Sequence, residues 1–223
     1  MNDSREAILA SIREHLRQGK KISPEQQVEL VTRMSQHPRG VIPKRTEISH
    51  PELIALFCKQ AARVQADIQN VKGLQAIPQI INQYLNQKNQ PLKLRIATLP
   101  LIQQIHFPAD MEIQTGAAEK KDSASLTVCQ YGVAETGTLV FASGPATPTT
   151  LNYVPLIHIV ILPTDKIVGS YEDAWDKIRL LRPLPRAINF ITGPSRTADI
   201  EQKLLLGVHG PKFLLIILYE NEA

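Results

Sequence analysis

Apolar residues recur at helical spacing at the very start of the chain. Asp3 or Ser4 can cap a helix whose apolar positions follow the i, i+4, i+8 pattern of one helix face: Ile8, Ile12 and Leu16. We expect this helix to end at Gly19. The stretch that follows, from Lys20 to Arg45, contains three prolines and one glycine. Such a composition is typical of an arm with little regular structure, and it predicts at most one short helix, over residues 25–34.

Two further helices are predicted before the chain changes its pattern. The first begins near Ser49, because Ser49 and Glu52 have the spacing of a capping box, and its apolar positions continue to Ile68. The second covers residues 77–85, where isoleucines and leucine recur at helical spacing. Pro91 ends this helical part.

Strand-like patterns dominate after Pro91. Apolar and polar residues alternate over two segments, and short apolar or β-branched runs follow over four more: 92–97, 125–131, 138–142, 157–162, 187–191 and 213–219. One helix interrupts them at residues 171–179, with Ser170 as its cap. This order favours an α/β fold, in which helices flank a mixed, mostly parallel sheet.

The composition is that of an ordinary globular protein, with 43% hydrophobic and 21% charged residues among 223. The densest apolar runs, at residues 156–162 and 213–219, have the length of strands, so we expect no membrane span. The N-terminal residues are charged and lack the apolar core of a secretory signal. The sequence therefore predicts a cytoplasmic location.

The excess of positive charge lies in the first fifty residues. The chain has 25 Lys and Arg against 21 Asp and Glu, and residues 1–50 hold nine of the basic and six of the acidic ones. A nucleic-acid-binding domain normally concentrates basic residues on its folded body, so we expect no nucleic-acid partner. The pattern divides the chain into an N-terminal helix and basic arm, residues 1–48, and an α/β domain, residues 49–223.

The cysteines and histidines give no support to a metal site. Cys58 and Cys129 cannot supply the four thiolates of an iron–sulfur cluster, so we expect both to be small core residues and no cofactor in this chain. The six histidines show no H-x-x-x-H spacing. His158 lies within a predicted strand and is interpreted as a hydrogen-bonded core residue. His209, which has glycines close on both sides, is the best candidate for a functional histidine.

Three glycine-containing turns are candidate sites, because α/β sheets bind ligands in loops outside the carboxyl ends of their strands. The first turn, residues 132–138, places the carboxylate of Glu135 beside Thr136, Thr138 and the flexible Gly137. Glu135 suits a general base or a carboxylate nucleophile. The alternative is an ordinary turn in which Glu135 is solvated or accepts backbone hydrogen bonds.

The second turn, residues 143–150, is rich in hydroxyl groups and carries no charge. Its serine and threonines, with Ser143 and Gly144 at the start, are suited to contact an anion or an amide. The alternative is a surface connector between two elements.

The third turn, residues 192–199, and the segment 207–211 offer donors for an anion. A glycine in each lets a ligand approach the backbone closely, and hydroxyl and guanidinium groups stand next to them. The candidate ligand-binding residues here are Gly193, Ser195, Arg196, Thr197, Gly207 and Gly210. Asp199 and His209 are candidates for a proton-transferring pair. Neither a Walker loop nor a dinucleotide-binding fingerprint is present.

Four segments in order along the chain together resemble the LUD-domain family, which includes lactate utilization proteins: residues 134–138, 143–152, 193–201 and 206–211. The resemblance implies a fold like that of CoA transferases and sugar-phosphate isomerases, close to 5-formyltetrahydrofolate cyclo-ligase. It also implies a role in oxidising L-lactate to pyruvate alongside two iron–sulfur partner proteins.

Two hypotheses about activity remain open at this point. In the first, the chain is an accessory subunit of a lactate-oxidising system, and its grooves dock partners or hold a small anionic ligand. In the second, it is an enzyme in its own right that acts on a small anionic substrate. Glu135 would then be the nucleophile or base, and Asp199 with His209 would move protons.

Overall fold

The computed structural model describes residues 2–17, 22–200 and 203–220. The chain divides into two compact units, Met1–Val41 and Ile42–Ala223, and each is described by itself. Residues 42–48, which the sequence pattern groups with the arm, belong to the second unit. The reason is local packing, since Thr46 in the short helix η1 (Lys44–Thr46) is buried.

The first unit consists of two helices, α1 (Asn2–Arg17) and α2 (Pro24–Gln36). The predicted opening helix is confirmed, but Asp3 and Ser4 lie within it and do not cap it; Gly19, its predicted end, lies outside the described residues. The second helix is longer at both ends than residues 25–34, because Ser23 and Gln26 form a capping box and Pro24 occupies the first turn. Its C-cap is His37, whose φ is 46°. No residue of α2 is buried.

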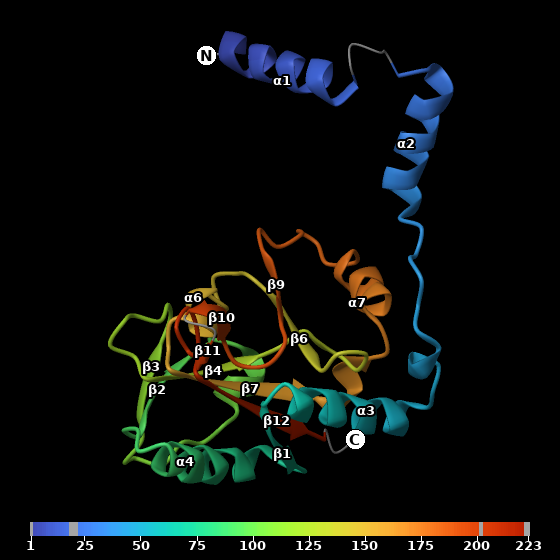
Figure 1. Cartoon of the computed structure of the whole chain (residues 1–223). Coiled ribbons are helices and arrows are strands. Elements are labelled where there is room, and N and C mark those ends of the chain that lie inside the picture. The colour runs from blue at the N-terminus through green and yellow to red at the C-terminus, as the bar shows by residue number, and fades with distance from the viewer. Residues whose placement is uncertain (1, 18–21, 201–202, 221–223) are drawn as a thin grey trace. The chain divides into compact units, whose positions relative to one another are not determined.

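The second unit contains a parallel sheet whose strands, within the described residues, follow the order β1-β12-β7-β4-β2-β3 (Figure 1). These strands are β1 (Asp67–Val71), β2 (Lys93–Ile96), β3 (Glu112–Thr115), β4 (Ala124–Val128), β7 (Ile157–Pro163) and β12 (Phe213–Tyr219). The central strands β7 and β12 are buried on both faces, as their continuous apolar runs predict.

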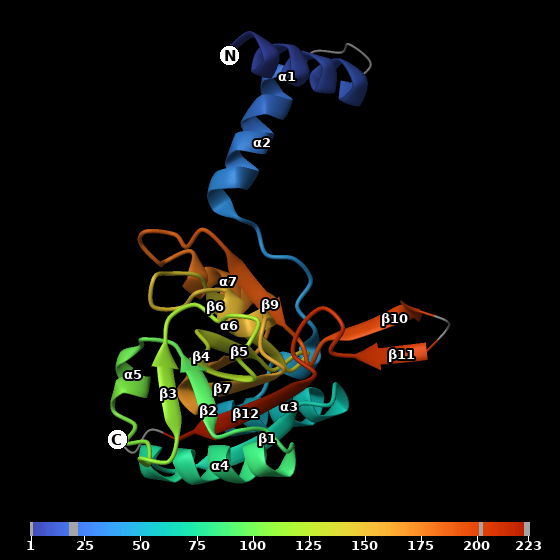
Figure 2. The ribbon, with the colours of Figure 1, turned by 90° about the vertical axis from the view of Figure 1, so that its left-hand side faces the viewer.

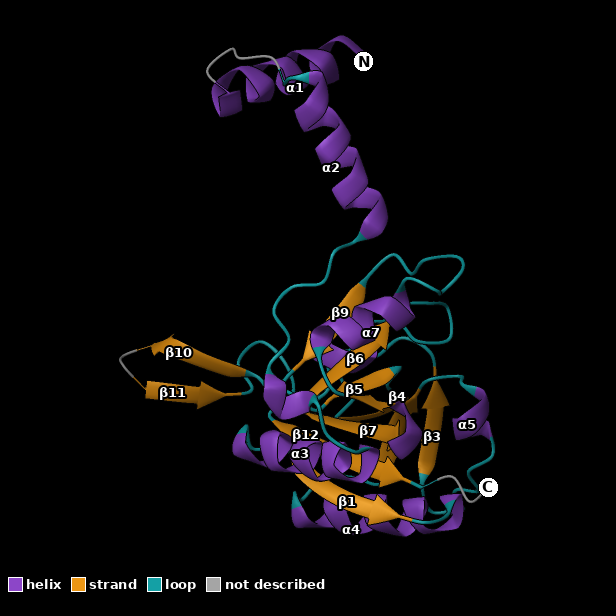
Figure 3. Cartoon of the chain, turned by 90° about the vertical axis from the view of Figure 1, so that its right-hand side faces the viewer, coloured by secondary structure: helices purple, strands orange, loops and turns teal. Residues whose placement is uncertain are grey.

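A second, mixed sheet has the order β8-β5-β6-β9, and Figure 3 labels its strands β5, β6 and β9. Its strands are β5 (Tyr131–Val133), β6 (Thr138–Ala142), β8 (Ile167–Val168) and β9 (Ile188–Ile191). The strands β10 (Arg196–Ile200) and β11 (Lys203–Leu206) pair only with each other among the described strands. Figure 2 shows this hairpin projecting from the body of the second unit.

Helices cover both faces of the parallel sheet. On one face, α4 (Ile77–Gln87) packs its buried Ile81 and Leu85 against Ile159 and Leu215. On the other face, α3 (His50–Arg63) and the second sheet enclose a separate core (Figures 1 and 3). Four further helical segments in the described residues are short: η2 (Leu74–Ala76), α5 (Pro100–Gln103), α6 (Thr150–Tyr153) and η3 (Thr164–Lys166). The helix α7 (Tyr171–Ile178) is longer. The expected α/β fold with flanking helices is confirmed.

The helix predicted from Ser49 ends earlier than its apolar pattern suggests. Its capping box is present, and the Ser49 N–H donates to the Glu52 carboxylate at 2.9 Å. The helix ends at Arg63, and Gln65 turns the chain with a φ of 66°. Ile68 therefore lies in the edge strand β1, and the prediction that the helix reaches it is wrong. The strand is polar and largely exposed, which removes the alternation by which strands are recognised.

None of the helices in the described ranges is both long and apolar enough to cross a membrane.

Candidate functional site

The turn with Glu135 joins β5 to β6 and is held against α3. Gly137 has a φ of 68°, and a Cβ atom there would lie 2.3 Å from the backbone nitrogen of Ala61. Its N–H donates to the Val133 carbonyl at 3.0 Å. Glycine is therefore required here by conformation and by close packing on the helix backbone, whatever else the turn does.

The two threonines of this turn belong to a network of hydroxyl groups. The Oγ1 atom of Thr138 is buried and lies 2.6 Å from that of Thr136, 2.8 Å from the Tyr171 hydroxyl and 2.6 Å from the Thr192 Oγ1. These bonds tie the turn to α7 and to the end of β9. The hydroxyls of Thr136 and Thr138 thus have protein partners, and they link the turn to a cavity that Thr192 lines.

Glu135 faces Arg45. Its carboxylate Oε1 lies 3.8 Å from the Arg45 guanidinium, and its carbonyl accepts a hydrogen bond from the same group at 3.3 Å. The N–H of Glu135 donates to the Gly169 carbonyl at 3.0 Å. Its side chain is 17% exposed. The described residues that line the two cavities discussed below do not include Glu135.

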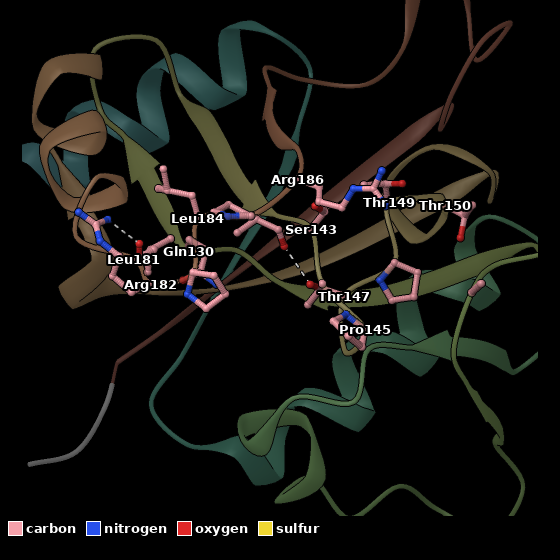
Figure 4. A pocket seen from close by; sticks show the side chains of 16 residues that line it. Gln130, Ser143, Pro145, Thr147, Thr149, Thr150, Leu181, Arg182, Leu184 and Arg186 are labelled. Atoms are coloured by element: carbon pink, nitrogen blue, oxygen red, sulfur yellow. Dashed lines mark hydrogen bonds between the residues drawn. The ribbon is translucent and has the colours of Figure 1, made fainter. Parts of the chain in front are cut away.

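The larger of these cavities, of about 690 Å³, lies beside the second predicted turn (Figure 4). Ser143 and Gly144 line it, together with residues 181–186. The hydroxyls of the turn hold the wall in shape: the Ser143 Oγ accepts from the Ala187 N–H at 2.9 Å, and the Thr147 Oγ1 donates to the Ala142 carbonyl at 2.8 Å. The turn therefore connects two elements and forms a cavity wall, and its contact with an anion or an amide stays a prediction.

The smaller cavity, of about 310 Å³, gathers most of the third predicted turn. It is lined by Asn152, Tyr153, His158, Phe190, Ile191, Thr192, Gly193, Pro194, Ser195, Arg196, His209, Gly210, Pro211 and Leu214. His158 and Leu214 are each the second residue of their strand and pair in register, so the cavity lies at the amino ends of β7 and β12. The expectation that the site lies outside the carboxyl ends of strands holds only for β9, which residues 192–195 follow directly. For the parallel sheet it does not hold, because the connections before β7 and β12 form the rest of the wall.

Glycines allow the two wall segments to pack closely. Gly193 has a φ of 74°, and a Cβ there would lie 2.5 Å from the Val64 carbonyl oxygen. A Cβ on Gly210 would lie 3.2 Å from the Cβ of Ser195. The Ser195 N–H donates to the Pro211 carbonyl at 2.9 Å, which joins the two segments directly. The wall is therefore preorganised by backbone contacts.

His158 is the most deeply buried polar group of this cavity. It is 1% exposed, and its Nε2 atom lies 2.8 Å from the Thr127 hydroxyl. Its Nδ1 atom has no hydrogen-bond partner among the described residues. Its ring lies 5.4 Å, between centroids, from that of Phe141. Burial lowers the pKa of His158 to about 3, so the imidazole is neutral at physiological pH.

The described lining of this cavity contains an arginine and an exposed histidine. Arg196 and His209 are exposed residues in its lining, and the Arg196 guanidinium donates to the Val64 carbonyl at 2.5 Å. No Asp or Glu occurs among its described lining residues. The cavity therefore combines the cationic guanidinium of Arg196 with a neutral, buried histidine, an arrangement that favours an anion over a cation.

The structure thus distributes the predicted site residues over several places. Gly193, Ser195, Arg196, His209 and Gly210 come together at the smaller cavity. Thr197 pairs with Leu205 in the β10–β11 hairpin, and Gly207 donates its N–H to the Ser195 carbonyl. The backbone of Asp199 lies in β10, but its side chain falls outside the described residues. Its pairing with His209 stays a prediction.

Sequence reasoning missed Asn152 and the cavity side of His158. Asn152 is 5% exposed and belongs to the short helix α6. His158 is hydrogen-bonded and buried, as predicted, yet it also lines the cavity. The available signal is a polar residue within an apolar run, which indicates a partner but not a ligand.

The cysteines are packed into the protein. Cys129 is 3% exposed, and burial raises the pKa of its thiol far above the usual range. Cys58 is half-buried, and burial raises the pKa of its thiol too. Within the described ranges, no cluster of three or more histidine, cysteine, aspartate or glutamate side chains is placed to hold a metal ion.

Comparison with known proteins identifies the family. The LUD domain model matches residues 54–219, which covers most of the chain. The chain belongs to the LUD-domain family. Among curated relatives, lactate utilization protein C of Halalkalibacterium halodurans is 26% identical over 99% of this chain and 100% of its own length. An uncharacterized protein of Neisseria meningitidis is 38% identical to the present chain. That match covers 42% of the present chain and 41% of the Neisseria protein.

A solved structure supports the fold of this LUD-domain protein. The crystal structure of a DUF162 family protein from Deinococcus radiodurans matches 77% of this chain and 99% of its own, with a TM-score of 0.61 and 20% identity. The lactate utilization protein C of Bacillus subtilis is 38% identical over 44% of this chain and 43% of its own length. Several of these alignments therefore span less than half of the relative, whereas the Halalkalibacterium one is end to end.

Proposed function

We propose that this protein is a component of a lactate utilization system. In that system it supports the oxidation of L-lactate to pyruvate together with iron–sulfur partner proteins, as a subunit without a cluster of its own. The observation that carries the proposal is the end-to-end match to a lactate utilization protein C, over 99% of this chain and 100% of that one.

The thiol chemistry supports an accessory role. An iron–sulfur cluster commonly takes four thiolates, and this chain has two cysteines. Cys129 is buried, and its thiol has a raised pKa, which disfavours the thiolate that binds metal. The redox centres of such a system are therefore assigned to the partner proteins.

The first unit supports partner binding. The α1 face formed by Ile8, Ile12 and Leu16 is exposed, with fractions of 59%, 48% and 78%. On α2, Val28, Val31 and Met34 are exposed as well. Exposed apolar faces of this kind are typical of helices that dock into a groove on a partner. The positive excess of residues 1–50 favours a partner with an acidic rim.

The alternative is a stand-alone enzyme with Glu135 as nucleophile or base on a small anionic substrate, and Asp199 with His209 as proton carriers. The carboxylate of Glu135 is 17% exposed and lies 3.8 Å from Arg45. A substrate has to reach it beside this cation, which would itself attract an anion. The accessory role is the better supported one, because His209 lines a cavity that Glu135 does not line.

Growth on L-lactate as sole carbon source tests both the accessory role and the enzyme alternative. A strain that lacks the gene is complemented with the native chain, with Glu135→Gln or with Glu112→Gln, at equal soluble expression. Glu112 is the matched control, because its carboxylate forms an ion pair with Lys93 at 2.7 Å away from this turn. We expect all three to restore growth. Failure of Glu135→Gln alone supports the enzyme, and failure of the native chain refutes the lactate role.

Co-purification tests the partner assignment. The tagged native chain is expected to retain iron–sulfur proteins at low salt and to release part of them as ionic strength rises. Absence of any iron–sulfur protein at low salt contradicts the accessory role.

A further inference from the structure

The larger cavity has a lining that is cationic. Its described residues include Arg182 and Arg186 and no aspartate, glutamate or histidine. Both arginines are exposed, and neither forms an ion pair within the described residues. The Arg182 Nη1 atom donates to the Leu181 carbonyl at 2.8 Å, a bond that leaves the charge of the guanidinium uncompensated. Two cations that share a cavity without a countercharge favour an anionic ligand.

Hydroxyl groups of the turn at residues 143–150 add donors for such a ligand. The Ser143 Oγ accepts the Ala187 N–H at 2.9 Å, and its own hydrogen remains available for a second bond. Thr149 is the N-cap residue of α6, yet its side chain forms no cap hydrogen bond. Figure 4 shows the Arg186 side chain on the side of the cavity where Ser143 and Thr149 lie. A charged group of the ligand placed there meets a guanidinium and two hydroxyls together.

The rest of the lining is largely apolar, and the cavity is large. Leucines and prolines contribute most of the segment at residues 181–185, and Pro145 and Pro148 stand in the turn. The volume of about 690 Å³ lies in the middle of the range of ligand-binding cavities. A free inorganic anion or an acid of two or three carbons fills only a small part of it. The ligand therefore has an apolar or aromatic body besides its charged group.

We propose that the larger cavity binds a phosphate monoester with an aromatic or apolar body. The phosphate group carries a charge of about −1.5 to −2 near neutral pH, which matches two guanidinium groups. Its terminal oxygens accept hydrogen bonds from Arg186, Ser143 and Thr149, and the body lies against the leucines and prolines of residues 181–185. The inference goes beyond the proposed role in lactate utilization and does not depend on it.

Binding of matched compounds to the purified full chain tests the inference. Phenyl phosphate and AMP differ in the size of the body, and phenol and adenosine are the same molecules without the phosphate group. Inorganic phosphate lacks the body, and benzoate replaces the phosphate by a carboxylate monoanion. Isothermal titration calorimetry at low ionic strength gives the dissociation constants.

We expect phenyl phosphate or AMP to bind at least about tenfold more tightly than its own alcohol, inorganic phosphate and benzoate, because each comparator lacks the charge or the body. The ester that binds more tightly shows how large a body the cavity takes. If neither ester exceeds its alcohol, inorganic phosphate and benzoate, the proposal is overturned.

Variants assign the contacts. Arg186→Met keeps most of the side chain and removes its charge, and it is expected to weaken binding of the preferred ester about tenfold. Thr149→Val removes one hydroxyl and is expected to weaken binding about threefold. Arg63→Met, at an exposed position on α3 outside the described lining, is the matched control and leaves binding unchanged. An equal loss in Arg63→Met, or no loss in Arg186→Met, overturns the proposal.

The pH dependence of binding needs no substitution. The second pKa of a phosphate monoester is about 6, so the fraction of dianion falls about fourfold between pH 7.5 and pH 5.5. No residue of the described lining titrates in that range. We expect the affinity for the preferred ester to fall about threefold, whereas benzoate is ionised at both pH values and keeps its affinity. An unchanged affinity for the ester contradicts the match to a dianion and overturns the proposal.

Discussion

The imidazole of His158 on β7 lies 2.8 Å from the hydroxyl of Thr127 on the neighbouring strand β4. The contact fixes one ring nitrogen of a histidine that is 1% exposed and leaves the other facing no protein partner among the described residues. A buried contact between two strands thus holds this ring in place, while its second nitrogen has no hydrogen bond within the described residues.

We predict that His158 makes stability depend on pH. Burial lowers its pKa from 6.5 to about 3 in the folded chain, so the unfolded chain binds a proton first as the pH falls. The stability contributed by neutral His158 is present above pH 6.5 and is lost progressively between pH 6.5 and 3. Well below pH 6.5, the slope approaches about 1.4 kcal/mol per pH unit.

Urea unfolding at pH 7.5 and at pH 5.5 measures this effect in the native chain and in His158→Phe. As the pH is lowered from 7.5 to 5.5, the free energy of unfolding is expected to decrease more in the native chain than in His158→Phe, because phenylalanine does not titrate. The same difference between the two pH values in both proteins contradicts the prediction.

The fold is predictable from the sequence where burial determines the residue pattern. The strands β7 and β12 are continuous apolar runs because both of their faces are covered, and α4 shows its buried face at helical spacing. The edge strands β1 and β3 carry polar, exposed residues and therefore lack a recognisable strand pattern. Their strand conformation depends on pairing with β12 and β2, which one-dimensional patterns do not contain.

The candidate site is predictable only in part for the same reason. Gly193 and Gly210 stand out in the sequence, and the structure uses both at close backbone contacts. Which distant residues come together is a matter of topology. Glu135 lies against Arg45, and Ser195 lies against Gly210. The spacing of these residues along the chain predicts neither contact.

We predict that Gly137→Ala is strongly destabilising. The added Cβ would lie 2.3 Å from the Ala61 nitrogen at a φ of 68°, so both overlap and backbone strain oppose it. We expect a loss of about 3 kcal/mol or more in the free energy of unfolding. Gly116→Ala is the matched control, because its φ is 101° and no atom lies within 4 Å of the added Cβ. The loss in Gly116→Ala therefore measures the backbone strain alone, which we expect to be about 1 kcal/mol.

Chemical denaturation of both variants measures the difference. Equal losses in Gly137→Ala and Gly116→Ala mean that packing of the turn on α3 contributes nothing, which the close contact with Ala61 argues against.

We predict a large effect for the buried ion pair between Arg95 and Asp122. The Arg95 Nε donates to the Asp122 carboxylate at 2.9 Å, and the Glu119 N–H donates to it at 2.7 Å. Burial acts to raise the pKa of Asp122, and these hydrogen bonds outweigh it, so the pKa lies below its usual value. Asp122→Asn leaves the 8% exposed Arg95 with only the more distant and more exposed carboxylate of Glu119, at 3.9 Å, and we expect this to cost about 3 kcal/mol.

The exposed ion pair between Asp165 and Lys166, at 3.2 Å, provides the comparison. Asp165→Asn is expected to change the free energy of unfolding by less than about 1 kcal/mol. If thermal or urea unfolding gives Asp122→Asn a similarly small value, the buried pair is not a stabilising element.

The apolar face of α1 leads to the last prediction. Ile12 is 48% exposed and belongs to the first unit, so Ile12→Asp is expected to leave the melting temperature of the second unit unchanged. If this face docks an iron–sulfur partner, the substitution places a charge in the interface and lowers co-purification about tenfold or more. Ala10→Asp introduces the same charge about half a turn away, outside that face, and is expected to retain the partner. Equal retention of the partner by both variants assigns its docking to another surface, whereas equal loss assigns the effect to charge and not to the apolar face.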